Sequence, residues 1–225
     1  MTRDPHGRGA IRREGPAAHR ARLAAVLLHG RGATADDILA LGRALDLPDV
    51  VWWAPEAAGH SWWPVSFLAP LGALEPALSS ALQAVDRAVA AANAEGFADQ
   101  RIALVGFSQG GCLALEYTAR RGRPLRGVVG LSAGLVGTAE TSDPPQDDLY
   151  GHVPKAFDYP NTTLPNTSVY ISCHERDPHI PLRRVRESEA VFKALGAPCN
   201  VAIAPGAGHG VGGEDMAVLA GMLGQ

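Results

Sequence analysis

The sequence predicts an α/β fold in which helices cover both faces of a mostly parallel sheet. Short apolar runs alternate with longer helical patterns almost to the end of the chain. The apolar runs lack the polar–apolar alternation of a sheet with one face in water, so we expect both faces to be covered. Strands that alternate with helices pair in parallel through right-handed crossovers, which gathers functional loops at the carboxyl ends of the strands.

Six runs are predicted to form the strands. Each is short and apolar, and polar or turn-forming residues flank it. In chain order they cover residues 23–28, 50–53, 101–105, 127–131, 168–173 and 200–204.

Helical patterns fill most of the intervals between these runs. The longest covers residues 75–95, and its apolar side chains recur at intervals of three and four residues, as one helix face requires: Leu78, Leu82, Val85 and Val89. The remaining predicted helices cover residues 35–45, 109–121, 182–195 and 214–223.

The chain of 225 residues is long enough for one core, and residues 23–225 are predicted to form a single domain. The basic residues 1–22 are expected to be a flexible N-terminal extension, with a short edge hairpin near its end. Residues 133–167, rich in proline and aspartate, are predicted to form one long irregular loop.

Charge and composition limit the classes of molecule that the protein is expected to bind. A formal net charge of −3 and a pI near 6.2 argue against nucleic acid or an anionic membrane. No apolar run resembles a secretory signal or a membrane span, so we expect a cytoplasmic protein without stable membrane insertion. Cys112, Cys173 and Cys199 match no zinc spacing, and we expect reduced thiols and no metal. A homodimer is compatible with the sequence.

The segment Gly106-Phe107-Ser108-Gln109-Gly110 fits the pattern G-x-S-x-G of a nucleophile elbow, a sharp turn from a strand into a helix. Glycines two positions before and after the serine leave room in a crowded, strained turn. The pattern alone is weak in a chain with 26 glycines. Its place between a predicted strand and a predicted helix makes Ser108 the candidate nucleophile.

A serine hydroxyl needs a general base whose pKa lies near the working pH, which favours histidine. In chains with this elbow, the acid follows the serine and the histidine comes last. His209 lies in a glycine-rich loop between the last predicted strand and the last helix. Asp177 follows the strand predicted at 168–173, and the next residue, proline, restrains its backbone. Ser108, Asp177 and His209 are therefore the candidate catalytic residues.

Other histidines and carboxylates compete for these roles. His174 and His179 flank the candidate acid too closely to reach the serine, although His179 could line the site. His152 lies in the irregular segment. Glu175 is nearer the strand than the favoured acid, and Asp215 follows the candidate histidine, which breaks the order.

Stabilising an oxyanion requires two backbone N–H groups that point at one spot. Gln109 supplies one because it follows the nucleophile. The second is expected from the loop after the first strand, where His29-Gly30 ends an apolar run, and the amide of Arg31 is the candidate. We interpret His29 as a structural brace of this loop. The side chain of Arg31 could instead be a solvated charge at a permissive position, since only its amide matters to the mechanism.

Together, residues 27–33, 106–111, 177–181 and 208–210 resemble the phospholipase/carboxylesterase family of α/β hydrolases, which includes the acyl-protein thioesterases. The resemblance runs from about residue 23 through most of the chain. It implies an α/β-hydrolase fold with no large separate cap and no cofactor, with Ser108, Asp177 and His209 as the triad. Residues 59–64 resemble a family segment beside the active-site mouth, whereas the insertion at 138–167 is longer than the family's usual loop.

Trp62, Trp63 and Phe67 are the candidate substrate-binding residues, because they form an aromatic cluster in a loop after the second strand. Packing of that loop on the core is the alternative. The resulting hypothesis is a serine carboxylesterase that hydrolyses small-molecule esters of short to medium acyl chains through an acyl-enzyme. The alternatives are acyl thioesterase or lysophospholipase-type activity and, less favoured, a non-catalytic binding protein on the same fold.

Overall fold

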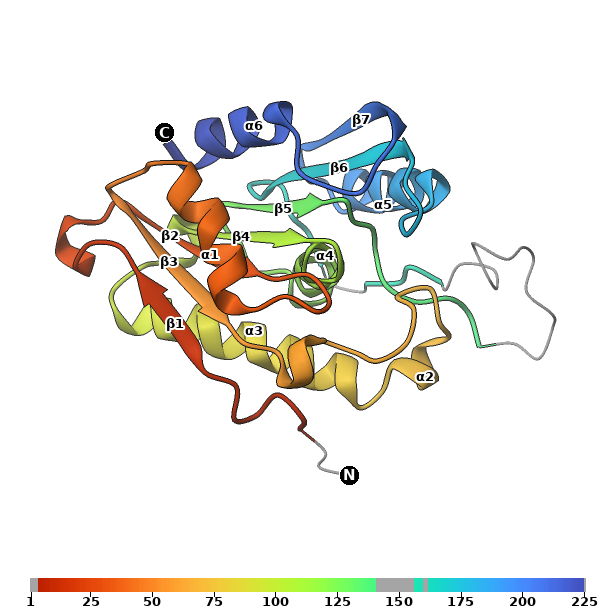
Figure 1. Ribbon diagram of the computed structural model, residues 1–225, viewed down its shortest axis with the longest axis horizontal. Helices are drawn as coiled ribbons and strands as arrows, with labels where there is room; N and C mark the ends of the chain where they lie inside the picture. Colours follow the sequence, from red (N-terminus) through yellow and green to blue (C-terminus); the bar gives the residue numbers. More distant parts are fainter. Residues whose placement is uncertain (1–3, 141–155, 160–161, 225) are drawn as a thin grey trace.

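A seven-stranded sheet runs through the molecule in the order β1-β3-β2-β4-β5-β6-β7 (Figure 1). The computed structural model describes residues 4–140, 156–159 and 162–224. β1 pairs antiparallel with β3, and the other pairings are parallel. The predicted α/β fold with a mostly parallel sheet is confirmed.

All six predicted strands and all five predicted helices are present. The strands are β1 (Ile11–Glu14), β2 (Leu23–Leu28), β3 (Val50–Pro55), β4 (Ile102–Phe107), β5 (Gly127–Leu131), β6 (Ser168–Arg176) and β7 (Cys199–Ala207). The α-helices are α1 (Ala35–Ala44), α2 (Leu71–Leu74), α3 (Ala77–Ala94), α4 (Gln109–Arg121), α5 (Leu182–Ala194) and α6 (Gly213–Gly224). Single 3-10 turns lie at Ala18–Arg20, Ala58–His60 and Asp99–Arg101.

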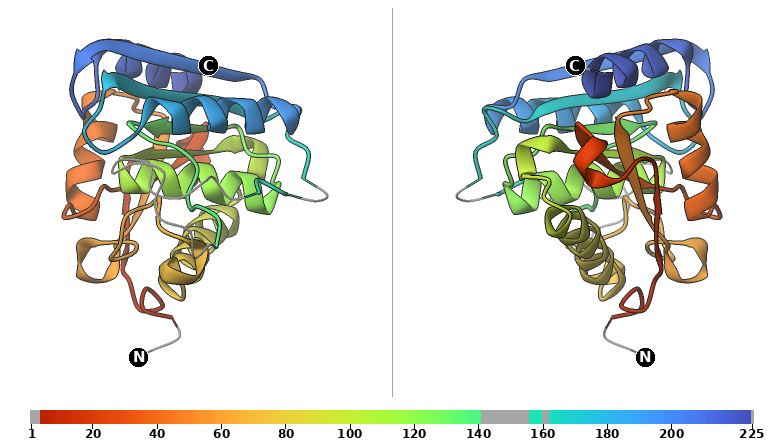
Figure 2. Two further views of the ribbon diagram at one scale, coloured as in Figure 1. Left: turned by 90° about the vertical axis from the view of Figure 1, so that its right-hand side faces the viewer. Right: turned by 90° about the vertical axis from the view of Figure 1, so that its left-hand side faces the viewer.

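Helices cover both faces of the sheet (Figure 2). Leu27 of β2 packs in one apolar cluster with Leu39 of α1 and Leu219 of α6. Its neighbour Leu28 faces the opposite way and joins a second cluster, to which α3, α4 and α5 contribute. Because both clusters are buried, the central strands carry apolar residues on both sides, which is why they show no polar alternation.

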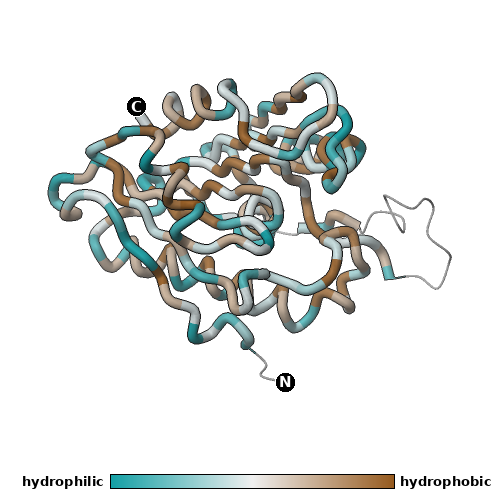
Figure 3. The backbone as a smooth tube through the Cα atoms, in the orientation of Figure 1, coloured by the Kyte–Doolittle hydropathy of each residue, from teal (hydrophilic) through white to brown (hydrophobic). Residues whose placement is uncertain are grey.

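The N-terminal extension that we expected to be flexible is packed on the domain over its described part, residues 4–22. β1 extends the sheet at the edge of β3, where Ile11 pairs with Pro55. Arg13 forms a two-pronged ion pair with Glu95 at 2.9 Å. Instead of the expected local hairpin, the strand pairs with a distant partner. Its polar residues hide it from hydropathy patterns, and β1 is coloured largely hydrophilic in Figure 3.

The chain after β5 stays close to the core before it leaves the described residues. Ala133, Leu135, Val136 and Thr138 are buried. Residues 141–155 and 160–161 of the predicted long loop, including His152, lie outside the described residues.

Candidate active site

The predicted elbow is present at the junction of β4 and α4. Ser108 has φ 54° and ψ −121°, a conformation that costs a non-glycine residue energy and that active sites often hold. A Cβ on Gly106 would lie 2.2 Å from the carbonyl oxygen of Gly110. A Cβ on Gly110 would lie 2.1 Å from the carbonyl oxygen of Leu28. Both glycines are therefore required by the backbone that crosses the turn.

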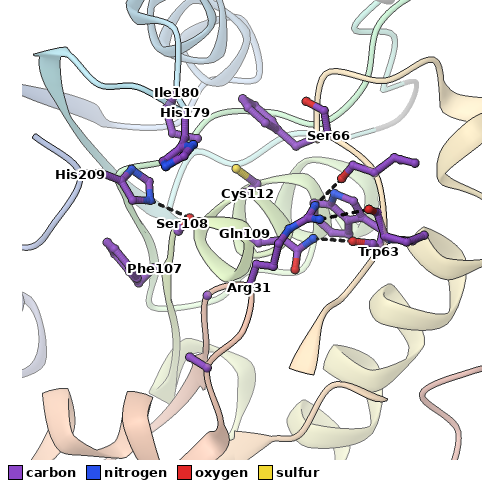
Figure 4. Close-up of a pocket in the computed structure, with 15 residues that line it drawn as sticks. Arg31, Trp63, Ser66, Phe107, Ser108, Gln109, Cys112, His179, Ile180 and His209 are labelled. Carbon is purple, nitrogen blue, oxygen red and sulfur yellow. Dashed lines mark hydrogen bonds between the residues drawn. The ribbon is translucent and has the colours of Figure 1, made fainter. Parts of the chain in front are cut away.

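Three predicted side chains form an unbroken chain of hydrogen bonds. Ser108 Oγ lies 2.9 Å from His209 Nε2 (Figure 4), and His209 Nδ1 lies 2.8 Å from Asp177 Oδ2 and 3.0 Å from Oδ1. An ionised carboxylate can only accept hydrogen bonds, so Nδ1 carries the ring proton. His209 Nε2 is then free to accept the hydroxyl proton of Ser108.

The buried carboxylate of Asp177 is fixed by its own turn. Its Oδ1 atom accepts hydrogen bonds from the backbone N–H of His179 at 2.8 Å and of Ile180 at 3.0 Å. Cys173 Sγ approaches Oδ2 at 3.7 Å. These contacts fix the position of the carboxylate beside His209.

The rival residues bind elsewhere. Glu175 accepts a hydrogen bond from the backbone of Gly206 at 3.0 Å, and Asp215 accepts one from the Tyr170 hydroxyl at 2.9 Å. His174 lies on β6. His179 packs edge-on against the His209 ring, with 4.8 Å between the ring centroids, and lines the same cavity.

The loop after β2 passes directly beside Ser108, the candidate nucleophile. A Cβ on Gly30 would lie 3.5 Å from both the Cβ of Ser108 and the carbonyl oxygen of Phe107. The backbone N–H groups of Arg31 and Gln109 donate no hydrogen bond to any other described residue. Two unused donors therefore flank Ser108, one on the loop and one at the start of α4.

His29 is buried beneath this loop, where we expected a brace. Its Nδ1–H donates to the carbonyl of Gly30 at 2.8 Å, and its Nε2 accepts from the N–H of Ala57 at 3.1 Å. Burial lowers the pKa of His29 below the ordinary histidine value, which favours the neutral ring that this pairing needs.

The candidate substrate residues divide into two groups. Trp63 and Phe67 line the cavity over Ser108, whereas Trp62 is fully buried behind its wall. Trp62 donates from its backbone N–H to Gln109 Oε1 and from its indole Nε1–H to the carbonyl of His29, both at 2.9 Å. Its tryptophan ring supports the site from behind and does not touch the cavity, so the substrate-binding role expected for Trp62 does not fit its position.

The cavity has a volume of about 510 Å³ and is lined in part by Ser108 (Figure 4). Most of its wall is apolar. It is lined by Gly30, Arg31, Ala33, Trp63, Pro64, Val65, Ser66, Phe67, Phe107, Ser108, Gln109, Cys112, His179, Ile180 and His209. Among the described residues that line it, Arg31 alone carries a permanent charge.

The guanidinium of Arg31 is not a free solvated charge. Its Nη1 donates to the carbonyl of Pro64 at 3.1 Å, and its Nη2 donates to that of Val65. These two carbonyls belong to the cavity wall. Arg31 therefore ties the loop that carries its amide to the loop that carries Trp63 and Phe67.

Sequence reasoning missed two contributions from α4. The Gln109 side chain donates from Nε2 to the carbonyl of Trp63 at 2.8 Å, which pins the cavity wall to the elbow. Cys112, one helical turn beyond Ser108, lines the cavity floor, and burial raises the pKa of its thiol to about 12. The helical spacing of Cys112 from Ser108 was visible in the sequence, whereas the partner of Gln109 was not.

The family model described as Phospholipase/Carboxylesterase matches residues 15–147, more than half of the chain. This chain belongs to the phospholipase/carboxylesterase family. The match spans the elbow and the loop of Arg31, and the family identifies the protein as an ester hydrolase.

Solved structures of other proteins are similar over nearly the whole chain. A phospholipase/carboxylesterase from Dyadobacter fermentans is 35% identical, with a TM-score of 0.84, covering 96% of this chain and 97% of its own. Esterase PE8 is 22% identical, with a TM-score of 0.71 and coverage of 96% and 97%. A Bacillus cereus carboxylesterase is 16% identical, with a TM-score of 0.70 and coverage of 97% and 94%. The latter two show a shared fold.

Two further findings concern metal ions and membrane spans. Among the described residues, no group of three or more histidine, cysteine or acidic side chains is arranged to hold a metal ion. In the same part of this esterase, every helix is too short or too polar to cross a bilayer.

Proposed function

We propose that this ester hydrolase is a carboxylesterase in which Ser108 is the nucleophile, His209 the general base and Asp177 the residue that orients the base. The observation that supports this most directly is the hydrogen-bond chain from Ser108 Oγ through both ring nitrogens of His209 to the buried carboxylate. Each role needs its neighbour within hydrogen-bond reach, and each has it.

In the first step, His209 Nε2 takes the hydroxyl proton while Ser108 Oγ attacks the ester carbonyl carbon. The carbonyl oxygen becomes an oxyanion that accepts hydrogen bonds from the N–H groups of Arg31 and Gln109. The C–O bond to the alcohol then breaks, and the alcohol leaves with the proton held on Nε2. The acyl group remains on Ser108 as an ester.

In the second step, a water molecule gives a proton to Nε2 and attacks the acyl carbon. The same two amides stabilise the second oxyanion. Its collapse releases the carboxylic acid and returns the proton to Ser108. Asp177 stabilises the imidazolium that His209 forms in both steps.

The cavity favours short to medium acyl chains. Trp63, Phe67 and Ile180 give it apolar walls, and its volume of about 510 Å³ limits how much chain it encloses. Each methylene that it buries contributes about 0.8 kcal/mol, or roughly a fourfold gain in kcat/KM. The gain ends where the chain leaves the cavity.

A series of p-nitrophenyl esters from acetate to palmitate tests this proposal, with Ser108→Ala as the control. We expect kcat/KM to rise with chain length, pass through a maximum at a short or medium chain and fall again. The Ser108→Ala variant should show no turnover above background. Equal turnover by that variant would contradict the nucleophile assignment, and a steady rise to palmitate would contradict the chain-length preference. Thioesters of the same acyl groups separate acyl selectivity from leaving-group selectivity.

A further inference from the structure

His6 lies before the segment that the family model matches, yet its side chain reaches the back of the candidate active site. The residue is almost fully buried. Its Nε2–H donates to the carbonyl of Trp62 at 2.9 Å, and its Nδ1 accepts from the N–H of Ala58 at 3.0 Å. Both ring nitrogens are thus used on the loop that follows β3.

Trp62 connects this contact to both proposed oxyanion donors. Its backbone N–H binds the side chain of Gln109, and its indole N–H binds the carbonyl of His29, two residues before Arg31. The indole also packs against the rings of His6 and His29, with centroid distances of 5.5 Å and 5.0 Å.

We propose that His6 is a positioning residue of the esterase: through Trp62 it holds the amides of Gln109 and Arg31 in the geometry that the oxyanion requires. The proposal rests on the oxyanion-hole assignment made above. A shift of Trp62 would move the side chain of Gln109 on one side and the carbonyl of His29 on the other. Donors aligned in advance stabilise the oxyanion without reorganisation.

The backbone around His6 is fastened so that the ring is presented in one place. Its N–H donates to Ser80 Oγ at 2.8 Å, and its carbonyl accepts from Arg87 at 2.8 Å. Arg87 also forms an ion pair with Asp4 at 3.6 Å. Ser80 and Arg87 both belong to α3, so a long, regular helix fixes the segment.

The pairing requires a neutral ring, because Nδ1 must accept while Nε2 donates. Burial lowers the pKa of His6 and so favours this form. The two contacts can also be separated by substitution. Glutamine places an amide nitrogen near the position of Nε2, whereas asparagine places an oxygen near that of Nδ1 but cannot reach Trp62.

The test measures kcat, KM and the melting temperature of the full-length protein with p-nitrophenyl butyrate, for His6→Ala, His6→Gln and His6→Asn. Arg13→Ala is the matched control, since it removes the Arg13–Glu95 ion pair of the same N-terminal segment without touching Trp62. Deleting an oxyanion donor costs about 100-fold or more in kcat, and misplacing it should cost less. We expect His6→Ala to lower kcat roughly tenfold with KM nearly unchanged.

Glutamine should restore most of kcat, and asparagine should not. Arg13→Ala should lower the melting temperature and leave kcat unchanged. A wild-type kcat in His6→Ala would overturn the proposal, as would an equal loss of kcat in Arg13→Ala. If His6→Ala does not fold, the comparison of His6→Gln with His6→Asn tests the proposal. Equal kcat values for these two variants would overturn the proposal.

Ser108→Ala, measured alongside, keeps this result separate from the proposed function. An inactive Ser108→Ala with a wild-type kcat in His6→Ala rejects only the role of His6. Turnover retained in Ser108→Ala rejects the catalytic assignment itself.

Discussion

The Nε2 atom of His209 lies 2.9 Å from the Oγ atom of Ser108, although 101 positions separate the two residues in the chain. In the sheet, β5 and β6 lie between the strand that ends before the serine and the strand that precedes the histidine. The glycine-rich loop after β7 must therefore cross the ends of both strands. Gly208 allows this, because a Cβ there would lie 2.6 Å from the His174 ring.

Replacing Asp177 with asparagine should remove most of the activity and leave the fold intact. The amide oxygen can keep the hydrogen bonds from His179 and Ile180, which turns the NH₂ group toward His209. His209 Nδ1 must then accept, so its Nε2 carries the proton and cannot take one from Ser108. We expect kcat to fall about 1,000- to 10,000-fold with KM little changed. Steady-state kinetics with p-nitrophenyl butyrate measure both.

The exposed rival Glu175 provides the control for this prediction. Glu175→Gln changes a carboxylate to an amide two residues away and should keep kcat within about twofold of the wild type. A large loss of kcat in Glu175→Gln together with little loss in Asp177→Asn would contradict the assignment of Asp177 and favour Glu175 as the acid.

Arg31→Ala should weaken substrate binding more than it slows catalysis. The variant keeps the backbone N–H at position 31 but frees the carbonyls of Pro64 and Val65, which belong to the cavity wall. A looser wall contacts the acyl chain less well, so we expect KM to rise severalfold and kcat to change by less. Arg12→Ala, whose ion pair with Asp36 is exposed, should change neither constant. A loss confined to kcat would mean that the Arg31 side chain acts on the reacting atoms.

Gly110→Ala should abolish the folded elbow. The added Cβ would lie 2.1 Å from the carbonyl oxygen of Leu28, and backbone cannot yield as a flexible side chain can. Gly221→Ala is the matched change, because nothing lies within 4 Å of the added atom in α6. It should stabilise the protein by about 0.5–1 kcal/mol. Circular dichroism melts measure both, and a Gly110→Ala protein as stable and active as the wild type would be inconsistent with the crowded turn.

The fold was predictable from the sequence because its central strands are buried on both faces. The continuous apolar runs of β2, β4 and β5 follow from that burial and identify these strands without other evidence. β1 was not predicted from the sequence because this edge strand is stabilised by pairing with β3 and by an ion pair, and neither leaves a local apolar pattern. The contacts of His6 were not predictable either, because its hydrogen-bond partners lie far away in the sequence.

The candidate site was predictable where chemistry fixes the local sequence. Gly106 and Gly110 around Ser108, and Gly208 before His209, have no room for a side chain, and they mark these residues in the chain. The role of Trp62 was not predictable, because an aromatic residue that lines a cavity and one that supports its wall look alike in a sequence. Only the structure shows that the indole N–H of Trp62 donates to the carbonyl of His29.

The three cysteines should react slowly with thiol reagents in the native protein. Burial raises the pKa of Cys112 and Cys173 to about 12 and that of Cys199 to about 11, so almost no thiolate exists at neutral pH. We expect N-ethylmaleimide to leave the esterase active over hours at pH 7 and to label all three thiols after denaturation. Mass spectrometry counts the labels. Rapid inactivation with one label on Cys112 would show that the cavity floor activates its thiol.

The most direct test of the catalytic assignment is covalent labelling of the intact protein with a fluorophosphonate, followed by mass spectrometry of its peptides. An activated serine displaces fluoride and keeps the phosphonate, whereas an ordinary hydroxyl does not react. We predict one label per chain, on the peptide that contains Ser108, and no label in Ser108→Ala. Labelling of Ser108→Ala at the wild-type rate, or an unlabelled wild-type protein, would contradict the assignment of Ser108 as the nucleophile.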